Sequence, residues 1–100
     1  MNRQITLQKA QDGQALLPSA TLTPDGRPRF VMKLLPELIQ SDAGVSYMVN
    51  HELFHEGFER ITRDIVDAHL LADDVFVDVG AHWGIMSLSA ATRWPGRVQV

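Results

Sequence analysis

The stretch that decides the predicted fold runs from Val75 to Ala91 and reads VFVDVGAHWGIMSLSAA. Its first five residues are apolar except for Asp78, a pattern typical of a buried strand. Gly80 and Gly84 follow, and the small to medium-sized side chains after them are compatible with a helix. An acidic residue at a strand end, a glycine-rich turn and an immediate helix predict a nucleotide-cofactor loop in an α/β sheet.

The spacing of the glycines distinguishes between cofactors. A dinucleotide fingerprint requires G-x-G-x-x-G, but Ala81 and His82 follow Gly80, so the middle glycine is missing. The observed D-V-G-A-H-W-G and the aliphatic helix after it resemble the first motif of S-adenosylmethionine (SAM)-dependent methyltransferases, in particular of the FkbM-type family. The resemblance begins at an aromatic-glutamate pair after Gly57 and covers about residues 57–91.

The resemblance implies roles for the side chains of this region. The two glycines of the loop would lie against the methionine portion of SAM. Asp78 would brace the loop, or accept from the amino group of the cofactor directly or through water. Ala81 and His82 would line the same turn, and Glu59 would face the cofactor or acceptor from the preceding helix. The predicted cofactor-binding residues are therefore Glu59, Asp78, Gly80, Ala81, His82 and Gly84.

The same side chains also have plainer interpretations. In the plainer interpretation, Asp78 does not bind the cofactor and merely accepts hydrogen bonds from loop amides, as a helix-capping side chain does. His82 can be a solvated loop residue, and Glu59 a surface carboxylate at a helix start. Trp83 either covers the cofactor or packs on a sheet edge. The catalytic base is not identified by the sequence.

The family resemblance implies an enzymatic function for the parent protein. By family analogy it is an O-methyltransferase that acts on a sugar or secondary-metabolite hydroxyl, so the partner is a small-molecule or glycan acceptor. The sheet of a methyltransferase of this class contains several strands after this motif. In this sequence only one further strand begins after it, at Arg97–Val100. We therefore expect an N-terminal fragment of a longer enzyme, inactive on its own.

The chain is predicted to divide after residue 50. Residues 1–50 are expected to form a β-rich extension or cap, and residues 51–100 the start of a SAM-binding Rossmann-like domain, truncated at its second strand. The predicted fold class is α/β, the opening of a doubly wound sheet. The predicted N-terminal elements are strands at 4–8, 20–23, 29–33 and 45–49, a hairpin turn at 24–28 and one helical turn at 36–40.

A helical period follows from Asn50, the predicted N-cap, to Leu71. Gly57 is a candidate break in this helix, because glycine costs about 1 kcal/mol in a helix interior. Four apolar residues recur at helical spacing and predict a stripe that packs in the core: Phe54, Phe58, Ile61 and Ile65.

A competing motif lies at the start of this helix. His51, Glu52 and His55 form an H-E-x-x-H pattern, in which the histidines could bind zinc and Glu52 could be the general base. The metzincin continuation requires glycine and histidine where Phe58 and Ile61 stand. We therefore assign no metal ligands. A zinc-dependent hydrolase remains one alternative function, and a non-catalytic, truncated binding domain remains another.

Composition limits the choice of partners and compartment. The net charge of −3 provides no basic excess for binding nucleic acid. The absence of cysteine excludes disulfides and thiolate metal sites, and fits a reducing compartment. No apolar run approaches the roughly 20 residues of a membrane span, and no signal-peptide pattern is present. We expect a cytoplasmic protein without nucleic-acid or membrane partners.

Overall fold

The structure is a computed structural model that describes residues 7–80 and 82–94. This part of the chain is of mixed α/β class, with a three-stranded antiparallel sheet and four helices. None of these helices combines the length and the apolarity that a bilayer crossing requires. The elements are β1 (Gln8–Lys9), β2 (Ala15–Pro18), β3 (Val31–Leu34), α1 (Pro36–Ser41), α2 (Ala43–Phe54), α3 (Arg60–His69) and α4 (Ile85–Arg93).

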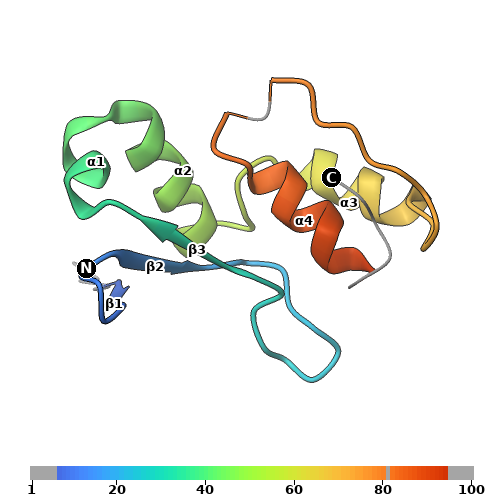
Figure 1. Ribbon diagram of the computed structural model, residues 1–100, viewed down its shortest axis with the longest axis horizontal. Coiled ribbons are helices and arrows are strands. Elements are labelled where there is room, and N and C mark those ends of the chain that lie inside the picture. The colour runs from blue at the N-terminus through green and yellow to red at the C-terminus, as the bar shows by residue number, and fades with distance from the viewer. Residues whose placement is uncertain (1–6, 81, 95–100) are drawn as a thin grey trace.

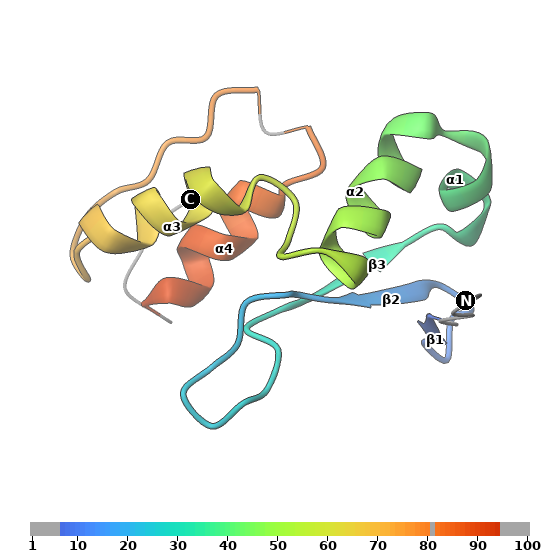
Figure 2. The ribbon, with the colours of Figure 1, turned by 180° about the vertical axis from the view of Figure 1, so that it is seen from behind.

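The helices form two groups. Helices α1 and α2 lie over the sheet, whereas α3 and α4 lie side by side at the other end of the molecule (Figure 1). In the view from behind, the loop between β2 and β3 extends from the sheet towards α4 (Figure 2). The hairpin therefore connects the two groups of helices.

The sheet is built around the hairpin of β2 and β3, and β1 pairs with the other edge of β2. Successive side chains of a strand point to opposite faces. This alternation buries Ala15, Leu17 and Met32 and leaves Val31 and Lys33 exposed. The buried face forms the core together with α2 and the start of α4.

The connection between β2 and β3 turns where the sequence predicts. Thr23 N–H donates to the carbonyl of Arg27 at 2.7 Å, and Gly26 has φ of 86°. Glycine adopts this conformation readily because it has no Cβ. The predicted hairpin turn at 24–28 is confirmed, and so is the helical turn that begins at Pro36.

The strand predicted at 45–49 is wrong, because these residues belong to α2. Asp42 caps this helix by accepting from the N–H groups of Gly44 at 2.9 Å and Val45 at 3.1 Å. Val45, Met48 and Val49 then bury one helical face. A strong cap and a helical apolar period here outweigh the β-propensity of the valines.

Two separate helices replace the single helix predicted from Asn50 onward. Helix α2 ends at Phe54 and α3 begins at Arg60, with Gly57 between them at φ of 122°. The break at the glycine is confirmed. The predicted N-cap is wrong, because Asn50 lies inside α2, and the predicted domain boundary also falls within this helix.

Of the four residues in the predicted apolar stripe, only Phe58 packs against the core. Phe54, Ile61 and Ile65 are 42%, 78% and 57% exposed. On α3 the buried position is instead Arg63, whose side chain pairs with Glu52 of α2. The break at the glycine changes the relative orientation of the two helices, so the stripe that a continuous helix would present does not exist.

The strand predicted at 75–79 is also wrong within the described residues. These residues belong to the long loop from α3 to α4 (Figure 1), and Val77 and Val79 are 75% and 90% exposed. A strand is held by backbone bonds to neighbouring strands. The neighbour predicted from the sequence, at 97–100, lies outside the described residues, as does most of the strand predicted at 4–8. The helix predicted after the loop is confirmed as α4.

Candidate functional site

A cavity of about 240 Å³ lies where the loop before α4 meets the start of α3. The cavity brings Glu59 together with the loop residues Asp78, Gly80 and His82, four of the residues that the motif resemblance names. Its other lining residues are Phe58, Val79, Trp83, Ile85 and Met86.

Two predicted site residues are placed differently. Gly84 is the N-cap of α4 and does not line the cavity wall, whereas Ala81 lies outside the described residues. Because Gly84 has no side chain, no side-chain acceptor caps the first turn of α4. The first N–H groups of a helix have no intrahelical partner, so they are suited to bind an anionic group.

The backbone around the cavity adopts the left-handed region repeatedly. Glu59 and His82 have φ of 51° and 53°, and within residues 7–80 and 82–94 no other residue apart from glycine has a positive φ. This conformation costs a non-glycine residue about 1–2 kcal/mol, and such strain gathers at functional sites. Gly80 and Gly84 have φ of 70° and 78°. A Cβ on either glycine would meet no heavy atom of the described residues within 4 Å, so this part of the chain leaves the space open.

Asp78 holds the loop against the following helix. Its Oδ2 accepts a hydrogen bond from Ser87 Oγ at 2.7 Å, and its side chain is half-buried. The bond joins Asp78, near the end of the long loop from α3, to Ser87 in the first turn of α4. Asp78 therefore braces the loop from the side of the cavity.

Aromatic side chains form one wall of the cavity. Phe58 and Trp83 meet edge to face with ring centroids 5.8 Å apart, and the His82 ring lies 3.9 Å from that of Trp83. Trp83 also packs on α2, because a Cβ on Gly44 would lie only 3.0 Å from its ring. In the described structure this tryptophan therefore joins α2 to the loop before α4, and does not lie at a sheet edge.

The zinc-binding alternative conflicts with the position of Glu52. This side chain is fully buried, and its two oxygens accept from Arg63. The His51 and His55 rings are 4.8 Å apart, but the carboxylate is unavailable as a general base beside them. In the part of the chain that the structure describes, no group of three or more His, Cys, Asp or Glu side chains is arranged to hold a metal ion.

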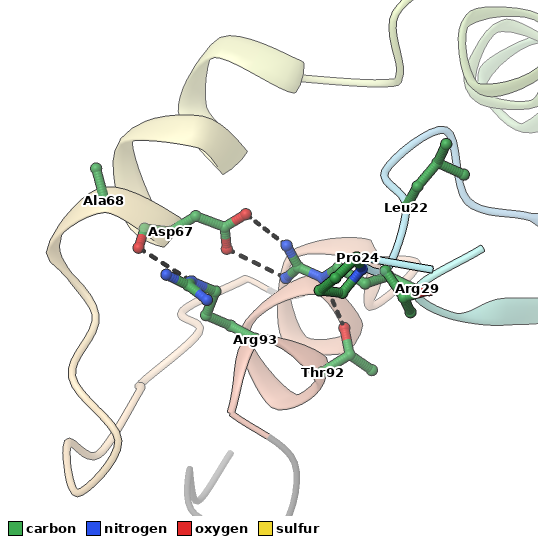
Figure 3. A pocket seen from close by; sticks show the side chains of 8 residues that line it. Leu22, Pro24, Arg29, Asp67, Ala68, Thr92 and Arg93 are labelled. Carbon is green, nitrogen blue, oxygen red and sulfur yellow. Dashed lines mark hydrogen bonds and ion pairs between the residues drawn. The ribbon is translucent and has the colours of Figure 1, made fainter. Parts of the chain in front are cut away.

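A second, larger cavity of about 640 Å³ lies between the hairpin loop and the ends of α3 and α4 (Figure 3). Its central contact is the bidentate pair of Arg29 with Asp67, at 2.5 and 3.1 Å. Arg29 also donates to the carbonyl of Ser89 and, at 3.4 Å, to Thr92 Oγ1. These charged groups satisfy one another, so we interpret the contact as a link between the hairpin and the helices.

Sequence reasoning missed Arg63, the partner of Glu52. On one continuous helix the two residues would lie roughly 16 Å apart along the axis, because each residue adds about 1.5 Å. The chain reverses between α2 and α3, which brings Arg63 Nη1 to 2.7 Å from Glu52 Oε1. The available signal was Gly57, which lies between the two residues and permits the reversal.

Comparison with known proteins finds no family model, no curated protein and no solved structure that matches the chain. We therefore base the functional assignment on the geometry of the smaller cavity and on the motif of residues 78–84.

Proposed function

We propose that this chain binds SAM at the cavity between α3 and the loop before α4. In this proposal it belongs to an FkbM-type O-methyltransferase with a Rossmann-like sheet, acting on a sugar or secondary-metabolite hydroxyl. The observation that carries the proposal is the convergence of Glu59 with Asp78 and Gly80, from separate parts of the chain, on one cavity.

The charges around the cavity suit the methionine end of SAM. Its carboxylate fits the uncapped N-terminus of α4, and its ammonium group fits the carboxylates of Glu59 and Asp78. The volume of about 240 Å³ is below the range of about 300–1,000 Å³ that is usual for whole small-molecule sites. The described residues therefore accommodate one end of the cofactor, and the open space at Gly80 allows close approach of the backbone.

When bound, SAM supplies a methyl group that passes to the acceptor oxygen as the carbon–sulfur bond breaks and the hydroxyl proton leaves to a base. The described residues contribute binding and orientation to this reaction. Asp78 and Ser87 hold the loop in place, and the Phe58–Trp83 wall shields one side of the cavity from water. Glu59, the residue immediately before α3, contributes its carboxylate.

Calorimetric titration with SAM tests the proposal directly. We expect saturable binding of one equivalent, and a loss of at least about tenfold in affinity in Gly80→Asn. Asparagine tolerates the left-handed region and its Cβ would meet no atom among residues 7–80 and 82–94, so the variant should fold while its side chain occupies the ligand space. Gly26→Asn, also at a positive φ but in the hairpin turn, is the matched control and should bind like the wild type.

Absence of saturable binding by the wild type at millimolar SAM would contradict the proposal, and so would unchanged affinity in Gly80→Asn. A non-catalytic binding domain predicts the same titration. Methylation of a hydroxyl acceptor by the intact protein separates that alternative from an enzyme.

A further inference from the structure

The ion pair of Glu52 and Arg63 joins α2 to α3 in the interior of the protein. Arg63 Nη1 and Nη2 contact the two carboxylate oxygens at 2.7 and 3.2 Å, and neither side chain is exposed. Hydrophobic residues of similar volume often stabilise a fold as well as a buried pair does. A pair in this position therefore suggests a role beyond stability.

Both members of the pair bind the backbone of Phe58. Glu52 Oε1 accepts from the Phe58 N–H at 2.8 Å, and Arg63 Nη1 donates to the Phe58 carbonyl at 3.0 Å. The backbone N–H of Arg63 donates in addition to the carbonyl of Glu59 at 3.0 Å. Two successive residues are thereby held, and the second has the left-handed conformation, with φ of 51° and ψ of 41°.

These two residues form one wall of the candidate cofactor cavity. The Phe58 ring packs edge to face against Trp83 in this wall, and Glu59 contributes a carboxylate. The Glu59 side chain makes no capping bond to α3, although it occupies the N-cap position. The residue lines the cavity without serving as a cap.

The N-terminal hairpin holds the pair from the opposite side. Glu52 Oε2 accepts from the Ala20 N–H at 2.6 Å, and Arg63 Nη2 donates to Thr21 Oγ1 at 3.2 Å. The Arg63 guanidinium also lies over the Phe30 ring, 5.6 Å from its centroid. Residues of the sheet region are thus connected through the pair to the cavity wall.

We infer that Glu52 and Arg63 are positioning residues, which fix Phe58 and Glu59 in the geometry that receives the ligand. The inference depends on the proposed function for the identity of that ligand. Rigid support of this kind is what keeps a binding site in its productive geometry. It also gives the N-terminal hairpin a role, because Ala20 and Thr21 complete the network.

The decisive variant is the double substitution Glu52→Leu with Arg63→Met, which removes both charges and keeps similar volumes. Two quantities are measured: SAM affinity by calorimetry, and hydrogen exchange of the Phe58 amide by NMR. If the pair positions the wall, the variant folds, its Phe58 amide exchanges at least about tenfold faster than in the wild type, and its SAM affinity falls at least about tenfold. Wild-type exchange and wild-type affinity in the folded variant would overturn the inference.

A second variant covers the case in which the double substitution does not fold. Arg63→Lys keeps the positive charge but loses the planar fork that reaches Glu52 and Phe58 together, so the same two changes are expected. The control is Asp25→Asn, which removes a charge from the exposed pair with Arg27 without touching Phe58 and should leave both quantities within about fivefold of the wild type.

The two proposals fail in different ways. If the wild type does not bind SAM, the proposed function fails, and the exchange of the Phe58 amide alone decides whether the pair holds the wall. If the wild type binds SAM and Arg63→Lys changes neither the exchange nor the affinity, the positioning role is refuted while the proposed function stands.

Discussion

The substitution Gly57→Ala tests the connection between α2 and α3, in which the chain reverses its direction. The new Cβ would lie 3.0 Å from Arg63 Nη1 and 3.3 Å from Ala20 Cβ, on a backbone with φ of 122°. The methyl group therefore has to displace the guanidinium of a buried ion pair, or the hairpin behind it. We expect a strongly destabilised protein.

The magnitude has two parts. The unfavourable φ costs about 1–3 kcal/mol for a residue with a side chain. Breaking a buried ion pair completely costs about 3–5 kcal/mol, and a partial displacement costs less. The expected total of about 2–5 kcal/mol is a large fraction of the free energy of unfolding of a typical domain, which is roughly 5–15 kcal/mol.

Urea unfolding followed by circular dichroism measures this loss, with Gly26→Ala as the matched control. Gly26 also has a positive φ, 86°, but a Cβ there meets none of the described atoms within 4 Å, so the control bears only the backbone cost of about 1–2 kcal/mol. The reasoning is refuted if Gly57→Ala is no less stable than Gly26→Ala, because the contact with the ion pair would then have no energetic consequence.

Two further predictions concern the link to the hairpin and the loop before the cavity. Asp67→Asn should destabilise the protein by about 1–3 kcal/mol in urea unfolding, because the side chains of Arg29 and Asp67 are only 12% and 19% exposed and the arginine loses a charged acceptor. The control Asp25→Asn, in the exposed pair with Arg27, should cost under about 1 kcal/mol. Equal costs for the two variants would contradict the difference in burial between the two pairs. Val77→Lys should change the unfolding free energy by no more than about 0.5 kcal/mol, because the side chain is 75% exposed. A cost of several kcal/mol would instead show that this segment is an interior strand, as the sequence predicts.

Several local features were predictable because neighbouring residues encode them. Gly26 and the flanking prolines specify the hairpin turn, and Pro36 the start of α1. Gly57 marks the break in the helical segment, and the residues after Gly84 form α4 as expected. In each case one residue with an unusual backbone preference is sufficient, so a reading of a few adjacent positions identifies the element.

The cavity was predictable in part for a different reason. The motif resemblance named Asp78 and Gly80 of the loop together with Glu59, and these residues line the same cavity. The motif did not indicate the bond from Ser87 to Asp78. It also did not indicate that Trp83 packs on α2, because that contact depends on the orientation of a separate helix.

The sequence by itself determined the turns and the helix break, and it named four of the residues that line the smaller cavity, Glu59, Asp78, Gly80 and His82. Only the tertiary structure decided that Val45 and its neighbours form a helix, that Val77 is exposed, and that Glu52 pairs with Arg63 rather than serving a metal. Backbone preferences act within a few residues, whereas burial and pairing depend on which distant segments pack together. A buried carboxylate requires a cation from elsewhere in the chain, and the fold alone selects which arginine that is.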